Sequence, residues 1–216
     1  MAFLDSVAVN VFPMSVEQED IKKALTEWEY RGVWVDLGKH LRTSCGLCDF
    51  PRIRYRFQIT NRFRETILWI GSTCIKRFEG KNIRVFDAAG NLLSEEAAAE
   101  KINNDVRAVN TAARKEDVLH TLRVLRTRDL EYREFIDSIG KQYKKEGKLT
   151  PKQLSVVVWR FNRQRPRIHH NPQSFRMCYR KSDKEDLQEM RTWKLSRLLP
   201  YLSKAQRKFV EALLRA

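Results

Sequence analysis

Three of the four cysteines in the chain have the spacing of metal ligands. Cys45 and Cys48 are separated by two residues, and Cys74 follows a segment that reads as two strands. Alternating arginines and apolar residues in RIRYRFQI (52–59) predict the first strand, and TILWI (66–70) predicts the second. Two antiparallel strands of similar length would return Cys74 to the Cys-x-x-Cys pair. Because thiolates are soft ligands that suit tetrahedral Zn²⁺, the spacing predicts a zinc site.

The fourth ligand of a tetrahedral site has several candidates. His40 lies five residues before Cys45 and could fold back easily, so it is preferred. Cys178 is the better chemical match but lies 104 residues after Cys74. Closing the longer loop adds only about 3 kcal/mol, so its length does not exclude it. The remaining candidates are Asp49, His169 and His170.

The predicted role of the zinc is structural. Ordinary buried thiols are the alternative for an isolated Cys-x-x-Cys pair, but the cysteine after the returning strand favours a metal. No His-x-Glu or His-Glu-x-x-His pattern accompanies the cysteines, and Asp49 is the only acidic residue close to them in sequence. A hydrolytic zinc site would need a water position and a nearby carboxylate base.

Positive charge is concentrated in parts of the chain. The formal net charge is +15, and the sequence pI is about 9.9. Residues 111–216 contain 26 Lys and Arg against 12 Asp and Glu, whereas residues 1–110 contain 16 against 15. The segment 42–84 is also basic, with 10 against 3. This distribution predicts a polyanionic partner, with nucleic acid favoured over an anionic membrane surface.

Two basic segments are candidate nucleic-acid surfaces. The alternation in RIRYRFQI predicts a row of arginines on one strand face, which could bind phosphate or guanine. The alternative is a solvated face or one covered by the acidic N-terminal helix. In 159–181, aromatic residues lie among the basic ones, which suits a single strand as well as a duplex. The predicted nucleic-acid-binding residues are Arg52, Arg54, Arg56, Arg62, Arg64, Lys76, Arg77, Arg160, Arg163, Arg165, Arg167, Arg176, Arg180 and Lys181.

The N-terminal elements form a β-rich module in this interpretation. A capping box in Ser15-Val-Glu-Gln18 predicts an amphipathic helix over about 16–30. GVWVDL (32–37) reads as a short apolar strand or a buried linker, and 81–93 as a small hairpin. A helix is predicted to begin at Cys74, and Ser72 could cap it.

From Ser94 the pattern is helical. The segment LTPKQL (149–154) contains the clearest helix start, with Thr150 as N-cap, Pro151 at the first position and Gln153 completing a capping box. The same pattern recurs at LSKAQ (202–206). The sequence therefore predicts an α+β fold in two domains. A zinc-stabilised β-hairpin module with one preceding helix would occupy 1–93, and a basic bundle of about five helices would occupy 94–216.

The expected compartment is the cytoplasm. No apolar run approaches the roughly 20 residues of a membrane span. The N-terminal stretch MAFLDSVAVNVF has no basic region before it and contains Asp5, which is not typical of a signal peptide. A Cys-x-x-Cys pair without a secretion signal indicates a reducing compartment, where metal binding is favoured over disulfides.

Several of these segments resemble a known kind of module. Cys45-Gly-Leu-Cys48, IRYRFQITN and the returning ILWIGSTCIKRF resemble a zinc-binding module of phage- and plasmid-borne proteins, and REFIDSIGKQYKKEGKLTPKQ is similar to their tails. A basic zinc module followed by helices also resembles the large subunit of type IV CRISPR effector complexes. That resemblance implies a subunit at the foot of an RNA-guided complex, without nuclease activity. Such a subunit contacts the guide RNA and recognises a short motif beside the target in duplex DNA.

The predicted function is therefore non-enzymatic nucleic-acid binding within a ribonucleoprotein complex. Guide RNA, duplex DNA and other subunits are the expected partners, with neither a membrane nor a small-molecule substrate. One alternative is a phage or plasmid protein that binds a host protein, such as an inhibitor or accessory factor of a defence system. A less favoured alternative is a metal-dependent nuclease using His169 and His170, because no recognisable ββα frame or metal carboxylate surrounds them.

Overall fold

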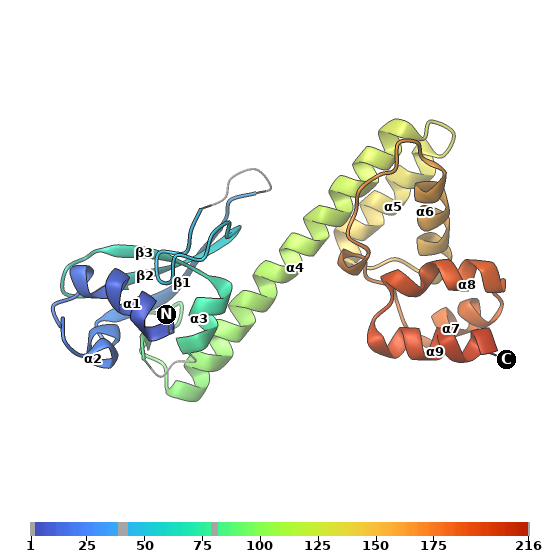
Figure 1. Cartoon of the computed structure of the whole chain (residues 1–216). Helices are drawn as coiled ribbons and strands as arrows, with labels where there is room; N and C mark the ends of the chain where they lie inside the picture. Colours follow the sequence, from blue (N-terminus) through green and yellow to red (C-terminus); the bar gives the residue numbers. More distant parts are fainter. Residues whose placement is uncertain (1–2, 39–42, 79–81, 216) are drawn as a thin grey trace. The chain divides into compact units, whose positions relative to one another are not determined.

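The computed structural model describes residues 3–38, 43–78 and 82–215. The fold is mixed α+β, as predicted, with a four-stranded sheet and many helices (Figure 1). The chain divides into two compact units, residues 1–110 and residues 111–216. The first unit contains the sheet and the three closely spaced cysteines, and the second is helical.

The sheet has the strand order β3-β2-β1-β4. Its members are β1 (Trp28–Asp36), β2 (Tyr55–Asn61), β3 (Ile67–Gly71) and β4 (Arg84–Val85). The antiparallel pair β2 and β3 contains the outgoing and returning strands predicted from the alternation. β1 pairs antiparallel with β2 and parallel with β4. Beyond β4 the chain turns back, since the Leu93 amide donates to the Val85 carbonyl, in the segment predicted as a hairpin.

Three helices of the first unit lie outside the sheet. They are α1 (Phe3–Val11), α2 (Ile21–Leu25) and α3 (Ser72–Phe78), with a short 3₁₀ turn at Phe12–Met14. The helix predicted at Cys74 is present as α3, but it begins two residues earlier, so that Ser72 is its first residue and not a cap before Cys74.

The prediction of one helix over about 16–30 is wrong. Helix α2 covers only five of these residues, and β1 begins at Trp28. Ser15 does not cap it, because its hydroxyl is buried and accepts the indole N–H of Trp28 (3.0 Å). Asp20 is the N-cap instead, accepting the amides of Lys22 and Lys23. Pairing of WEYRGVWVD with β2 buries Trp28 and Tyr30, so tertiary packing overrides the local helical pattern.

A buried carboxylate connects the segment before α2 to the sheet. Glu27 accepts the backbone amides of Val16 and Glu17 (both 2.8 Å) and the side-chain amide of Asn61 (2.9 Å). Glu27 and Asn61 are both buried. The three donors give this carboxylate the hydrogen bonds that it loses from water.

Glu27→Gln is expected to lower the free energy of unfolding by about 1–3 kcal/mol at neutral pH, because a glutamine cannot accept all three bonds. Burial by itself would raise the pKa of Glu27, but these hydrogen bonds outweigh it and the pKa lies below its ordinary value of 4.5. The stabilisation is therefore complete above the unfolded-state pKa and is lost as the pH falls through the lowered folded-state pKa. Urea unfolding should show a gap between the two proteins at neutral pH that narrows in acid. An equal gap at both pH values would contradict this role.

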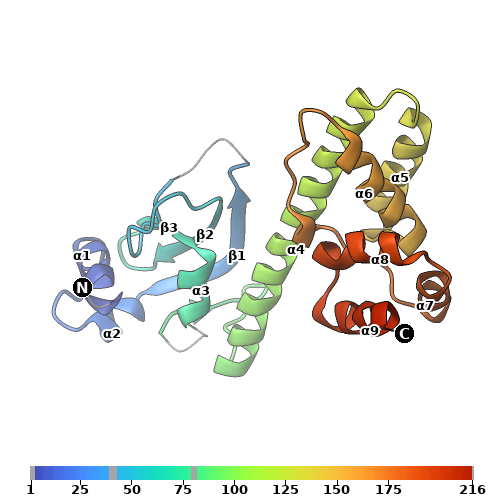
Figure 2. The same ribbon diagram turned by 45° about the vertical axis from the view of Figure 1, so that its right-hand side comes forward.

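One face of the sheet packs against α3 and the first part of α4 (Glu95–Arg128). The first core contains Phe57 and Ile59 of β2, Ile75 of α3 and Ile102 of α4. The Tyr30 hydroxyl of β1 donates to the Asp105 carboxylate of α4 (2.9 Å), and Figure 2 shows these two elements side by side.

Helix α4 contributes to both cores. The apolar positions 102, 106 and 109 pack in the first core, whereas 118, 122 and 125 pack in the second. These two stripes lie on one continuous helix, because 95–128 contains no glycine or proline to interrupt it. The predicted boundary after residue 93 lies at the start of α4, and the division between the compact units lies within this helix, after Asn110.

The second unit contains five helices after α4 among the residues that the structure describes. They are α5 (Arg133–Glu146), α6 (Pro151–Arg163), α7 (Lys181–Gln188), α8 (Thr192–Leu198) and α9 (Lys204–Arg215), with 3₁₀ turns at Pro172–Ser174 and Leu199–Tyr201. No helix in the described part of the chain combines the length and apolar character of a membrane span.

The two helix starts predicted from capping patterns in this unit are confirmed. The Thr150 hydroxyl accepts the Gln153 amide (3.2 Å), and the Gln153 side chain accepts the Thr150 amide (3.0 Å). Ser203 and Gln206 form the same pair of bonds at α9. Helix α5 ends at Gly147, whose positive φ of 68° suits a glycine C-cap.

Candidate metal centre and basic surfaces

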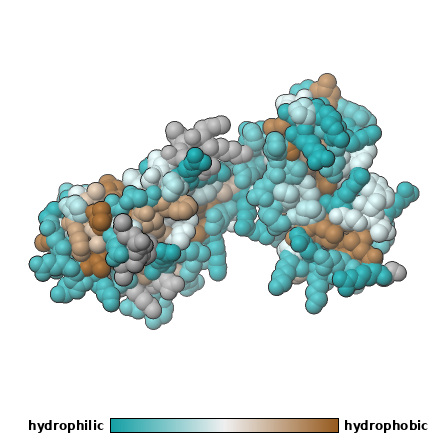
Figure 3. Space-filling view, viewed as in Figure 1, coloured by the Kyte–Doolittle hydropathy of each residue, from teal (hydrophilic) through white to brown (hydrophobic). Residues whose placement is uncertain are grey.

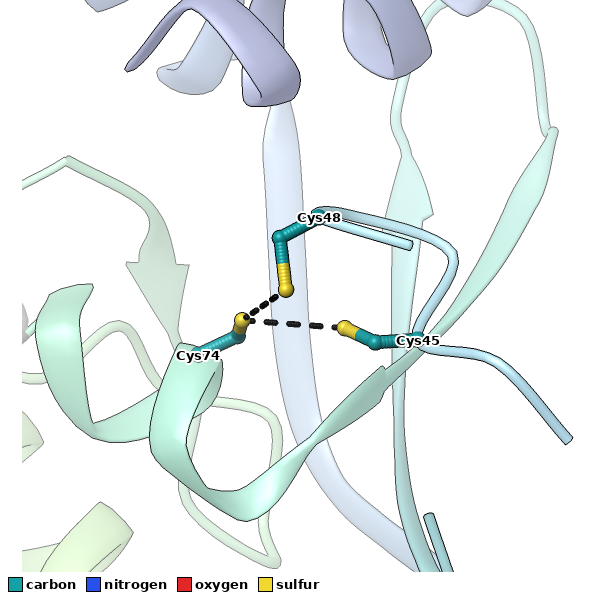
Figure 4. Close-up of side chains that lie close together, drawn as sticks. All are labelled: Cys45, Cys48 and Cys74. Carbon is teal, nitrogen blue, oxygen red and sulfur yellow. Dashed lines mark hydrogen bonds between the residues drawn. The ribbon is translucent and has the colours of Figure 1, made fainter. Parts of the chain in front are cut away.

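Three thiols meet at one end of the β2–β3 pair (Figure 4). Cys45 and Cys48 lie on the loop before β2, and Cys74 lies in α3, directly after β3. The Cys74 sulfur is 3.6 Å from that of Cys45 and 3.3 Å from that of Cys48. All three sulfur atoms lie within 4.8 Å of one another. The structure thus confirms that the three predicted ligands come together.

The Cys-x-x-Cys loop is held from two sides. The Gly46 amide donates to the Trp69 carbonyl of β3 (2.9 Å), and a Cβ at Gly46 would lie 3.2 Å from that oxygen, so a larger residue would crowd the contact. On the other side, the Asn10 side chain of α1 donates to the Leu47 carbonyl (3.3 Å) and the Asp49 carboxylate (2.9 Å). These bonds position the thiols before any metal binds.

Hydrogen bonding favours a thiolate at Cys45. The hydrogen bond between Cys45 and Cys74, together with backbone N–H groups including that of Gly71 (3.2 Å), lowers the pKa of Cys45 to about 5 despite its burial. The same interaction with Cys45, together with burial, raises the pKa of Cys74. A metal cation would displace the remaining thiol protons, because thiolates are the metal-binding form.

The donor set fits a tetrahedral soft-metal site. Zn²⁺ at about 2.3 Å from each sulfur would set neighbouring sulfurs about 3.8 Å apart, which is close to the observed separations. The three cysteines also line a cavity of about 410 Å³, together with Arg54, Arg77 and other side chains. A fourth ligand therefore has space beside the thiols.

The candidates for the fourth ligand lie in different parts of the chain. His40 lies outside the described residues and stays a prediction. Cys178 belongs to the second unit, where it is buried and its amide donates to the Leu149 carbonyl (2.7 Å). Asp49 is not part of the close group, and its carboxylate accepts Asn10 instead.

The arginines before and within β2 do not form the regular row that the alternation predicts. Arg52 has a left-handed φ of 59°, which interrupts the alternation, and the strand begins only at Tyr55. Arg54 donates two hydrogen bonds of 2.8 Å to the Asp36 carboxylate. Arg56 is in β2, and its guanidinium lies 4.8 Å from the centre of the Trp69 ring.

The other predicted basic residues of the first unit lie on its surface. Arg62 and Arg64 are exposed on the turn between β2 and β3, where the Arg64 guanidinium donates to the Pro13 carbonyl (3.1 Å). Lys76 and Arg77 are exposed on α3. The exposed cations of the first unit therefore lie on separate elements, the β2–β3 turn and α3, and not on one strand face.

The second basic segment is more exposed. Of its seven predicted residues, Arg160 is buried, and its guanidinium pairs with the buried Asp129 and with Glu131. We therefore leave it out of any binding surface. The other six are exposed, and we name them the 163–181 basic surface: Arg163, Arg165, Arg167, Arg176, Arg180 and Lys181.

The adjacent histidines have different environments. His169 is exposed, whereas the His170 ring stacks on Phe161 with 4.5 Å between centroids. The His170 ring nitrogens contact the Ile168 carbonyl (3.0 Å) and the Tyr201 hydroxyl (2.6 Å). These contacts give His170 a packing role. Within the described ranges, the cysteine cluster is the one group of three side chains that could hold a metal.

Comparison with known proteins gives no relative: no family model, no curated protein and no solved structure matches the chain. Fold and site therefore define an α+β protein with a three-cysteine candidate metal centre.

Sequence reasoning missed the support of the thiol loop by Asn10 and the burial of Arg160 against Asp129. Neither contact has a local sequence signal, because the partners are 31 or more residues apart.

Proposed function

We propose that this chain is a non-catalytic nucleic-acid-binding protein whose second unit contacts the phosphate backbone. The 163–181 basic surface carries this proposal. Its six cations are exposed, and the stretch 159–181 contains no acidic residue. A run of exposed cations with no acidic residue in the same stretch provides the electrostatic attraction that dominates binding to nucleic acid.

The wider charge distribution supports the same function. The second unit has a formal net charge of +14, from 26 Lys and Arg and 12 Asp and Glu. Figure 3 shows hydrophilic residues over most of the viewed face of this unit, with an apolar patch where α8 and α9 lie. Trp159, beside Arg163 on α6, adds an aromatic ring that is partly exposed. Aromatic rings among cations suit stacking against unpaired bases.

The proposed role of the first unit is to provide a metal-stabilised frame and a second contact with nucleic acid. Zn²⁺ bound by Cys45, Cys48 and Cys74 would tie the loop before β2 to α3. The exposed cations on the β2–β3 turn and on α3 would then be held by a rigid frame. In the fuller form of the proposal, implied by the resemblance, the protein is a subunit of an RNA-guided complex that tests a short duplex motif. Purification from the native host, with identification of bound RNA and co-purifying chains, would test that form.

A pair of matched variants tests the nucleic-acid contact. Arg163→Gln/Arg167→Gln should weaken binding to DNA and RNA and reduce the salt slope by about 2, because two phosphate contacts are lost. Lys22→Gln/Lys23→Gln removes the same charge from exposed positions of α2 and should have a smaller effect. Fluorescence anisotropy with labelled oligonucleotides measures both. Equal losses in the two variants would mean that net charge, and not this surface, determines binding. Tight binding to a host protein without affinity for oligonucleotides would favour the alternative function.

A further inference from the structure

A cavity of about 380 Å³ lies within the second unit. The extended segment 175–180 forms one side, and residues 201, 203 and 206, in the turn before α9 and its first turn, form another. Three cationic side chains line it: Lys148, Arg176 and Arg180. Among the described residues, no acidic side chain does so.

The backbone of this cavity is fixed by hydrogen bonds. The Leu149 amide donates to the Arg176 carbonyl (2.8 Å), and the Cys178 amide donates to the Leu149 carbonyl (2.7 Å). The buried Gln206 side chain donates to the Met177 carbonyl (3.0 Å). The segment that carries the two arginines is therefore held in place before a ligand arrives.

The side chains divide the cavity into an apolar wall and a charged rim. Phe175, Met177 and Tyr201 are buried, whereas Arg176 and Arg180 are exposed. The nearby acidic groups are Glu146 and Asp183. Together with burial, their negative charges raise the pKa of the Cys178 thiol, which lines the cavity. The carboxylate of Asp183 is buried and accepts the Arg180 backbone amide (2.6 Å), and Glu146 is exposed. Positive charge dominates the rim.

We propose that this cavity binds the terminal phosphate of a nucleic-acid strand. A terminal phosphomonoester carries a charge of about −1.5 to −2 at neutral pH, which matches a rim of three cations better than the single charge of an internal diester. A strand end can also enter a walled cavity, whereas an internal phosphate needs an open path for the chain on both sides. The inference rests on the proposed function, because the strand bound by the 163–181 basic surface supplies the phosphate.

Single strands of one sequence with different ends test the inference. The strands carry a 5′-phosphate, a 3′-phosphate or hydroxyls at both ends, and their affinities are measured by anisotropy at one salt concentration. The protein should bind one phosphorylated strand about tenfold more tightly than the hydroxyl strand, since charge-assisted hydrogen bonds are added. The corresponding nucleoside monophosphate should compete for this extra affinity.

Variants separate the cavity from the rest of the surface. Arg176→Gln/Arg180→Gln should bring the affinity ratio of phosphorylated to hydroxyl strand close to one. Arg163→Gln/Arg167→Gln should weaken all strands but keep the ratio. Salt-dependent binding without discrimination between the strand ends would overturn the inference and leave the proposed function standing. Binding to none of the strands would overturn both.

Discussion

Cys74→Ser is expected to reduce the metal content of the purified protein from about one equivalent to none. It should also lower the stability of the first unit by about 3–5 kcal/mol, because metal binding contributes directly to folding free energy. Cys74 connects α3 to the loop of Cys45 and Cys48, and its sulfur is within 3.6 Å of both of theirs. Elemental analysis measures the metal, and urea unfolding measures the stability.

Two further variants act as controls for this result. Cys178→Ser should retain the metal, because the cysteine is buried within the second unit. His40→Ala should lose most of it if His40 supplies the fourth ligand. A protein that keeps a full equivalent after Cys74→Ser would rule out the three-cysteine site. Native mass spectrometry that finds the parent protein metal-free and fully folded would do the same.

Arg160→Met is expected to lower the free energy of unfolding of the second unit by about 3–5 kcal/mol. The side chains of Arg160 and Asp129 are only 8% and 2% exposed, and the guanidinium pairs with both carboxylate oxygens of Asp129. Removal of the arginine leaves a buried carboxylate, near which only the Gln164 amide remains as a weak donor at 3.4 Å among the contacts described. The uncompensated charge is the source of the loss.

The double variant Arg160→Met/Asp129→Leu is the matched control for this pair. It removes both charges, so it should recover most of the lost stability. Thermal or urea unfolding measures all three proteins. If Arg160→Met unfolds like the parent protein but binds oligonucleotides more weakly, Arg160 is a surface contact and its structural role is refuted.

The local features of the fold were largely predictable from the sequence. The alternation in 52–59 and the apolar segment 66–70 identified the strand pair, and the spacing of Cys45, Cys48 and Cys74 identified the thiol cluster. The capping pattern at Thr150 identified the start of α6. Each of these signals depends on residues that are close in the chain or on a simple antiparallel return.

The features that sequence reasoning missed depend on distant partners. Trp28 pairs with Asn61 across the sheet, so the last residues of the segment with helical periodicity (28–30) belong to β1. Arg160 lies in a basic and aromatic stretch, but its side chain is buried, where it pairs with the buried Asp129. The sequence predicts one bundle from residue 94 onward, whereas the apolar positions of α4 pack in two different cores. Periodicity identifies an apolar face but not the element that covers it.

Metal centre and basic surfaces have complementary roles in this account. In the proposed function, the thiol cluster would fix the loop beside the sheet when a metal is bound, and the exposed cations would provide the affinity for a polyanion. Loss of the metal should therefore affect the stability of the first unit more than the contacts of the 163–181 basic surface. Loss of the surface cations should affect binding with little change in stability.

The affinity of the purified protein for labelled single-stranded and duplex oligonucleotides across a salt series tests the central claim most directly. If the basic surfaces neutralise about six phosphates, the logarithm of the association constant should fall linearly against the logarithm of salt concentration, with a slope near −5. Absence of binding at low salt, or a slope close to zero, would contradict the claim.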